Sequence, residues 1–177
     1  HPQAAVAYNN RGKYFFAHGL PDRALNDFNA ALVLQPDYVT ALGNRALLSI
    51  QSGEYGRAIT DLDRAIAINP LDTRNINNRG ALAVKQGDFQ QALSYLNTAL
   101  EINPKYSDAY YNRGILFFAL NDYDQSLKDL TEALRIDPYY TKAYLKRARL
   151  YLDLVQPENA VKDAEKAVSL EPASAAA

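Results

Sequence analysis

The chain has 177 residues, with 19 Lys and Arg against 20 Asp and Glu, so its formal net charge is −1. This balance argues against a surface built as a whole for nucleic acid or acidic lipid, and the 48% of hydrophobic residues argues against wholesale disorder. No apolar run approaches the roughly 18 residues of a membrane span, and the lack of cysteine excludes disulfides, thiol nucleophiles and Cys-ligated zinc. We expect a soluble segment, cytoplasmic or, if an upstream signal is removed, extracytoplasmic.

Prolines recur every 34 residues and divide the chain into five units. Six prolines keep this spacing: Pro2, Pro36, Pro70, Pro104, Pro138 and Pro172. A period of this length is typical of arrays in which each supersecondary unit stacks on the next. The sequence therefore predicts one array over residues 1–177, with units at about 5–38, 39–72, 73–106, 107–140 and 141–174.

Each unit is predicted to form two helices. Small residues at positions 8, 20 and 27 of the unit, and large apolar residues at positions 24 and 28, follow helical spacing. A residue that accepts left-handed backbone at position 15, such as Gly19, ends the first helix, and the recurring proline ends the second. The fifth unit departs from this pattern at Val155 and Ala164. The predicted helices are, in chain order, 5–18, 22–35, 39–52, 56–69, 73–86, 90–103, 107–120, 124–137, 141–154 and 158–171.

Together with an apolar or aromatic residue at position 4, this pattern resembles the tetratricopeptide repeat over nearly the whole chain. Position 4 carries Tyr8, Leu42, Ile76, Tyr110 and Tyr144. The resemblance implies an all-α solenoid, a right-handed superhelix of antiparallel helix pairs. It also implies that the first helix of each pair lines a concave groove, where extended peptides or partner helices bind.

The sequence offers little for catalysis. Histidine occurs only as His1 and His18, and no Walker phosphate loop, HExxH or GxSxG motif is present. His18, next to Gly19, is interpreted as a residue of a helix's last turn, where a cation suits the helix dipole. The carboxylates follow the repeat and form no candidate metal cage. We therefore expect no enzyme activity, no catalytic residue, no metal and no cofactor in this segment.

Position 7 is arginine in every unit, and position 23 is aspartate in four of the five. This matching of residues on companion helices predicts a repeated Arg–Asp bridge, with a basic stripe for phosphate as the alternative. Tyr95 replaces the aspartate in the third unit, so Arg79 is expected to lack a carboxylate partner within its own unit. The predicted structural ladder consists of Arg11, Arg45, Arg79, Arg113 and Arg147 with Asp27, Asp61, Asp129 and Asp163.

Position 6 is asparagine in four units and Lys146 in the fifth. Asparagine is a mediocre residue for a helix interior, so four in phase need an explanation. Its amide carries both donor and acceptor groups, which match the backbone of a peptide. The resemblance implies that this position faces the groove. The alternative is that these amides bond neighbouring helices and set the superhelical pitch. The four asparagines are Asn10, Asn44, Asn78 and Asn112.

Basic residues gather at the other groove positions and predict an acidic or carboxylate-bearing ligand. Lys13, Arg74, Lys85, Lys142, Lys146 and Arg149 stand against Asp108 and Asp153, for a predicted face of about +4. Tyr111 adds an aromatic contact. Phe16 and Phe118 are interpreted as core residues, with apolar contacts in the groove as the alternative. Asn112, Lys142 and Lys146 also match positions of the carboxylate clamp of chaperone-binding tetratricopeptide domains. The clamp's earlier Lys and Asn are replaced here by Asn77 and Ala81.

The sequence thus predicts a protein–protein interaction scaffold that binds an extended peptide or partner helix in its groove. One alternative is a structural array that self-associates through its terminal units, since no further amphipathic helix follows Pro172 to cover Val161, Val168 and Leu170. A second is a substrate-recognition module of a larger enzyme, and the lack of an initiator Met favours a processed or cut piece. Nucleic-acid binding and membrane insertion of this segment are not expected.

Overall fold

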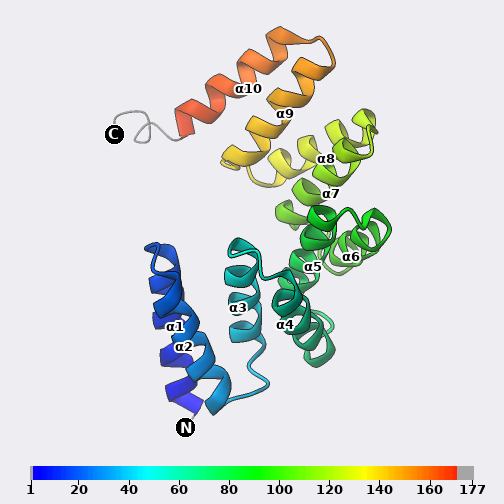
Figure 1. Cartoon of the computed structure of the whole chain (residues 1–177). Helices are drawn as coiled ribbons and strands as arrows, with labels where there is room; N and C mark the ends of the chain where they lie inside the picture. Colours follow the sequence, from blue (N-terminus) through cyan, green and yellow to red (C-terminus); the bar gives the residue numbers. More distant parts are fainter. Residues whose placement is uncertain (1, 171–177) are drawn as a thin grey trace. The chain divides into compact units, whose positions relative to one another are not determined.

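The computed structural model describes residues 2–170, which form ten α-helices and no strands (Figure 1). The elements are α1 Pro2–Ala17, α2 Pro21–Leu34, α3 Val39–Gln51, α4 Tyr55–Ile68, α5 Thr73–Gln86, α6 Phe89–Ile102, α7 Ser107–Ala119, α8 Tyr123–Ile136, α9 Thr141–Asp153 and α10 Pro157–Leu170. The predicted all-α solenoid of helix pairs is therefore confirmed. Residues 171–174, the predicted end of the fifth unit, lie outside the described residues.

Most helix ends agree with the sequence-based boundaries to within a residue or two. The second helix of each pair begins one residue earlier than predicted, because the residue at position 17 of each repeat joins its first turn. These residues are Pro21, Tyr55, Phe89, Tyr123 and Pro157. Pro21 and Pro157 are the first residues of α2 and α10, where a missing N–H is not needed. Asp88 and Asp122 cap α6 and α8 by accepting hydrogen bonds from the backbone N–H groups of Gln91 and Gln125.

The two helices of each pair are joined by a turn with one residue in left-handed backbone conformation. The φ angles at this residue are +69° at Gly19, +78° at Gly53, +79° at Gly87, +59° at Asn121 and +57° at Val155. Glycine takes this conformation without steric cost and asparagine tolerates it, whereas a β-branched side chain is strained there. The fifth pair keeps the turn geometry at the expense of strain in Val155.

Replacing Val155 by glycine is expected to raise the free energy of unfolding by about 1 kcal/mol. The valine side chain is 85% exposed, so its removal sacrifices little packing while it relieves the left-handed strain. Thermal or denaturant unfolding measures the gain. The same change at Leu154, whose φ is −87°, serves as the control and should destabilise the protein. Equal effects of the two substitutions would contradict the assignment of strain to Val155.

The chain divides into two compact units, each of which is larger than a 34-residue repeat. The division falls inside α5, between Leu82 and Ala83. The first unit has α1 to α4 and most of α5. Leu32 of α2 packs on Ala41 and Leu42 of α3, and Phe28 packs on Leu48 of α3. The second helix of a pair thereby covers the first helix of the next pair, and this junction gives the first unit its apolar core.

The second unit repeats this packing with different side chains. Leu96 of α6 packs on Leu116 of α7, and Leu134 of α8 packs on Ala143 of α9. Gly114 is the small residue at position 8 of its repeat, and it lets α7 and α8 approach closely. The Ser126 hydroxyl of α8 donates to the backbone carbonyl oxygen of Gly114 at 2.8 Å. Several tyrosines pack around this core: Tyr110, Tyr111, Tyr140 and Tyr144.

The recurring arginine joins the two helices of a pair through the recurring aspartate. In four pairs its Nε and Nη2 atoms donate to both carboxylate oxygens of that aspartate at 2.7–2.9 Å. The four aspartates are buried and the bonds are bidentate and charge-assisted, although the Arg11 side chain itself is exposed. The pairs are Arg11–Asp27, Arg45–Asp61, Arg113–Asp129 and Arg147–Asp163.

Three of these four arginines also bond the preceding helix pair, a contact that the repeat pattern does not predict. The Nη1 atom donates to the side chain at position 25 of that pair: Arg45 to Asn29 at 2.7 Å, Arg113 to Asn97 at 2.8 Å and Arg147 to Thr131 at 3.1 Å. Arg79, whose own unit has Tyr95 at position 23, donates to the Asp63 carboxylate of the preceding pair at 2.9 Å. The carboxylate is thus supplied from across the junction.

Candidate functional site

A cleft of about 140 Å³ lies between the first helices of two consecutive pairs in the first unit. It is lined from α3 by Asn44 and from α5 by Asn78, two of the predicted ladder asparagines. The predicted cation Arg74 also reaches it. The remaining lining residues, which the sequence analysis did not single out, are Thr40, Gly43, Leu47 and Asn75. The cleft is therefore polar and is bounded by amide groups.

Gly43 and Asn75 shape the floor of this cleft. A Cβ atom at Gly43 would collide with the carboxamide of Asn75, so only glycine lets that side chain lie over α3. Asn75 is buried, and its side chain on α5 lies against the backbone of α3 at Gly43. The sequence carries a signal for this feature, because position 5 of the repeat is glycine only in the second 34-residue repeat.

The asparagines at position 6 differ in how they are used within the chain. The Asn44 amide nitrogen donates to the Asn9 carboxamide oxygen at 2.8 Å, and the buried Asn9 donates in turn to Asn10 at 3.4 Å. The first of these bonds links α3 to α1, and the second lies within α1. Within the described part of the chain, the Asn78 amide has no such partner and lies open to the cleft.

In the second compact unit, Lys146 of α9 lies against an aromatic ring of α7. Its ammonium nitrogen lies 4.0 Å from the centroid of the Phe118 ring. Burial lowers the pKa of Lys146 below its usual value, because desolvation penalises the charged form. Phe118, interpreted from sequence as core, is half-buried and also contacts Tyr123.

Two of the predicted groove cations have carboxylate partners of their own. Arg74 lies 3.1 Å from Asp72, and Arg149 lies 3.4 Å from Asp153. Both arginine side chains are exposed, so the cations remain accessible while their charge is partly balanced locally. The other cations at groove positions, Lys13, Lys85 and Lys142, are exposed.

An aromatic pair joins α7 to the loop before α9. The Tyr111 and Tyr140 rings lie tilted against each other with centroids 5.0 Å apart, and burial raises the pKa of Tyr111. The Tyr140 hydroxyl donates to the Asp108 carboxylate at 2.6 Å. Burial, and then this carboxylate, raise the pKa of Tyr140 well above its usual value. Asp108 is therefore engaged by a tyrosine from the loop before α9, and the role of Tyr140 was missed because it lies outside the groove positions.

Two features of the described residues bear on other kinds of site. Within residues 2–170, no three acidic or histidine side chains gather as metal ligands would. No helix in the same range is both long and apolar enough to cross a membrane. His18 directly follows α1, its Nδ1 atom lies 2.8 Å from the Tyr14 carbonyl oxygen, and its ring stacks on Tyr14.

The fold and the polar first-helix face define a helical-repeat scaffold for protein interactions. Models of the tetratricopeptide repeat match residues 9–73 and 77–141, and a further one matches residues 141–174. The chain belongs to the tetratricopeptide repeat family. Proteins of this family bind protein or peptide partners and are generally scaffolds without enzymatic activity.

Solved structures agree with this assignment. The thermophilic tetratricopeptide protein TTC0263 of Thermus thermophilus is 24% identical, with a TM-score of 0.89 over 97% of this chain and 94% of that one. A repeat protein of Parabacteroides merdae is 26% identical, with a TM-score of 0.77 over 93% and 64%. YrrB, described as having an unusual peptide-binding site, is 22% identical, with a TM-score of 0.62 over 96% and 87%. A comparison with curated proteins gives no match.

Proposed function

We propose that the chain binds an extended peptide, and that Asn44 and Asn78 hydrogen-bond the peptide backbone in the cleft between α3 and α5. The observation that carries this proposal is the cleft itself, because both asparagines line it. At about 140 Å³ it is smaller than the pockets that enclose whole small molecules, of roughly 300 Å³ and more. Its size suits a stretch of backbone with small side chains.

The two amides have complementary roles in this proposal. The Asn44 amide nitrogen is already committed to Asn9, which leaves its carbonyl oxygen to accept a peptide N–H. Asn78, which has no such partner among the described residues, can donate to a peptide carbonyl and accept from a peptide N–H. A bound backbone would thus satisfy groups that otherwise face solvent, as extended-peptide recognition requires.

In the second compact unit, Lys142 and Lys146 of α9 select ligands that carry a carboxylate. Lys146 is partly desolvated, and an anionic partner would offset the cost that burial imposes on its charge. Asn112 and Tyr111, also half-buried on α7, and Arg149 on α9 provide further polar and aromatic contacts. The preferred ligand is therefore a peptide with acidic residues or a free C-terminus.

This proposal is tested with peptides that are selected, from a random displayed library, for binding to the full chain. Asn78→Ala with Asn44→Ala should weaken binding of the selected peptides roughly 10- to 100-fold, the loss of two hydrogen bonds. Asn26→Ala, at an exposed asparagine on α2, is the matched control and should bind normally. Fluorescence anisotropy measures the affinities. Equal affinity of the double variant and the control would show that the asparagines do not hold the peptide.

The carboxylate preference is measured on the same peptides made with a free or an amidated C-terminus, and with acidic residues replaced by their amides. Lys142→Gln with Lys146→Gln should lower affinity for the anionic forms toward that of the neutral forms. Lys166→Gln, at an exposed lysine on α10, is the control. Affinity that is insensitive to ligand charge would contradict the preference and leave the asparagine contacts to be judged separately.

A further inference from the structure

The outer faces of the α1/α2 and α9/α10 pairs expose side chains of the kinds that other pairs bury at their junctions. On α10, Val161 is 55% exposed and Val168 is 65% exposed. On α1, the Tyr14 side chain is 58% exposed, whereas the residues at the same unit position in the other pairs are buried. Those buried residues are Leu48, Leu82, Leu116 and Leu150.

The internal junctions define which positions meet when one pair stacks on the next. Position 28 of one pair packs on positions 3 and 4 of the next, as Leu32 does on Ala41 and Leu42. Position 24 packs on position 10, with three examples: Phe28 on Leu48, Leu62 on Leu82, and Leu96 on Leu116. Position 25 accepts a hydrogen bond from the arginine at position 7, as Asn29 does from Arg45.

The same positions on the two outer faces complement each other in size. Position 24 of the fifth pair is Ala164, where the other pairs carry Phe28 or leucine. Position 10 of the first pair is Tyr14, where the other pairs carry leucine. A small residue on α10 is therefore matched by a large one on α1, and the two changes conserve the volume that the junction must fill.

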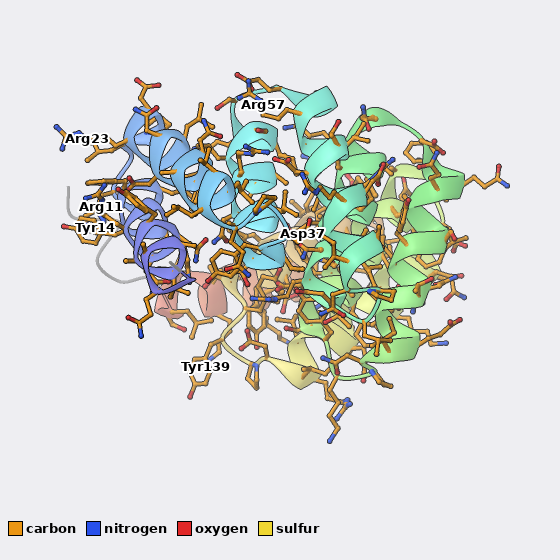
Figure 2. All side chains as sticks on the ribbon, turned by 90° about the horizontal axis from the view of Figure 1, so that it is seen from below. Arg11, Tyr14, Arg23, Asp37, Arg57 and Tyr139 are labelled. Carbon is orange, nitrogen blue, oxygen red and sulfur yellow. The ribbon has the colours of Figure 1, made fainter. Side chains whose placement is uncertain are left out.

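The two faces also complement each other in charge. Position 25 of the fifth pair is Glu165, which is exposed on α10. Arg11, at position 7 of the first pair, is 58% exposed, and within the described residues its hydrogen bonds go to Asp27 alone. Figure 2 shows Arg11 and Tyr14 projecting together from the side of the α1/α2 pair that faces away from α3. The arginine that elsewhere reaches the preceding pair is thus available for a carboxylate.

We propose that a second copy of this chain docks head-to-tail, with the α10 face of one copy packed on the α1 face of the other. In this interface Ala164 meets Tyr14, Glu165 meets Arg11, and Val168 meets Tyr8, as the corresponding positions do at the internal junctions. The contact is heterologous, because two different faces meet, so each copy can bind a further copy at either end. This interface does not involve the peptide cleft.

Sedimentation velocity on the full chain, from low micromolar to several hundred micromolar, tests this association. The wild-type chain should form species that grow with concentration. Tyr14→Lys blocks only the α1 face and Val168→Lys blocks only the α10 face, so each variant alone should stay monomeric. An equal mixture of the two should form a dimer and nothing larger, since each variant keeps the one face that the other needs.

Val33→Lys is the matched control, because Val33 is 80% exposed on α2 at a position that no junction uses. It should associate as the wild type does, and circular dichroism checks that every variant keeps its helices. A wild-type chain that stays monomeric at every concentration would overturn the proposal. So would dimerisation of either blocked variant alone, which indicates contact between like faces, or a mixture of folded variants that stays monomeric.

Discussion

Arg113→Ala is expected to lower the free energy of unfolding by roughly 3–5 kcal/mol, the cost of breaking a buried ion pair by removing one partner. Asp129 is only 2% exposed, and both of its carboxylate oxygens accept from the Arg113 guanidinium at 2.7 and 2.9 Å. Without the arginine, a carboxylate stays buried without a counter-charge. The Asn97 carboxamide also loses its donor at the junction. Denaturant unfolding monitored by circular dichroism measures the loss.

The matched control is Arg135→Ala, which removes an arginine of the same unit from an exposed pair with Glu132. Water replaces the lost bonds there, so the free energy of unfolding should hardly change. Arg79→Ala should also destabilise the protein, because Arg79 is itself buried and bonds Asp63. Equal, small effects of the Arg113 and Arg135 substitutions would contradict a stabilising role for the ladder.

Leu62→Ala should destabilise the protein by roughly 2–5 kcal/mol, which combines the lost burial and the cavity left behind. Leu62 is fully buried at a junction and packs on Ala46 and Ala58 of its own pair and on Leu82 of α5. Because Leu62 fills the space between two stacked pairs, its truncation leaves a cavity at their junction. The midpoint and slope of denaturant unfolding report this loss.

Leu71→Ala is the control for the leucine substitution. Leu71 lies between α4 and α5 and is 69% exposed, so its truncation removes almost no buried surface. The expected result is an unfolding curve close to that of the wild type. If Leu62→Ala unfolds like Leu71→Ala, the junction at Leu62 does not carry the packing energy that its burial implies.

The sequence predicted the helices well because their ends depend on local chemistry. Glycine and asparagine at the turns and prolines between the pairs fix where helices stop, and the small residues fix which faces meet. The bonds across junctions were missed for a physical reason. The partner of Arg79 is Asp63, on a different pair, and only the stacking geometry brings the two together.

The candidate site was predicted only in outline. Two of the periodic asparagines, Asn44 and Asn78, line the cleft, but the cleft also depends on Gly43, whose lack of a side chain admits Asn75. Such a pair is specified by the distance between α3 and α5, which periodicity alone does not give. Likewise, Asp108 was predicted as an anion of the groove face, and its bond from Tyr140 of the following loop depends on tertiary structure.

The bond between Arg79 and Asp63 also gives the repeats a fixed order. In the other pairs the arginine takes its carboxylate from its own unit, so such units are interchangeable in charge. Arg79 of the third repeat instead depends on the Asp63 carboxylate of the second repeat. Deleting the second unit would bring Arg79 next to Asn29, and deleting the third would bring a second carboxylate to Arg113. Moving either repeat without the other would therefore break this ion pair.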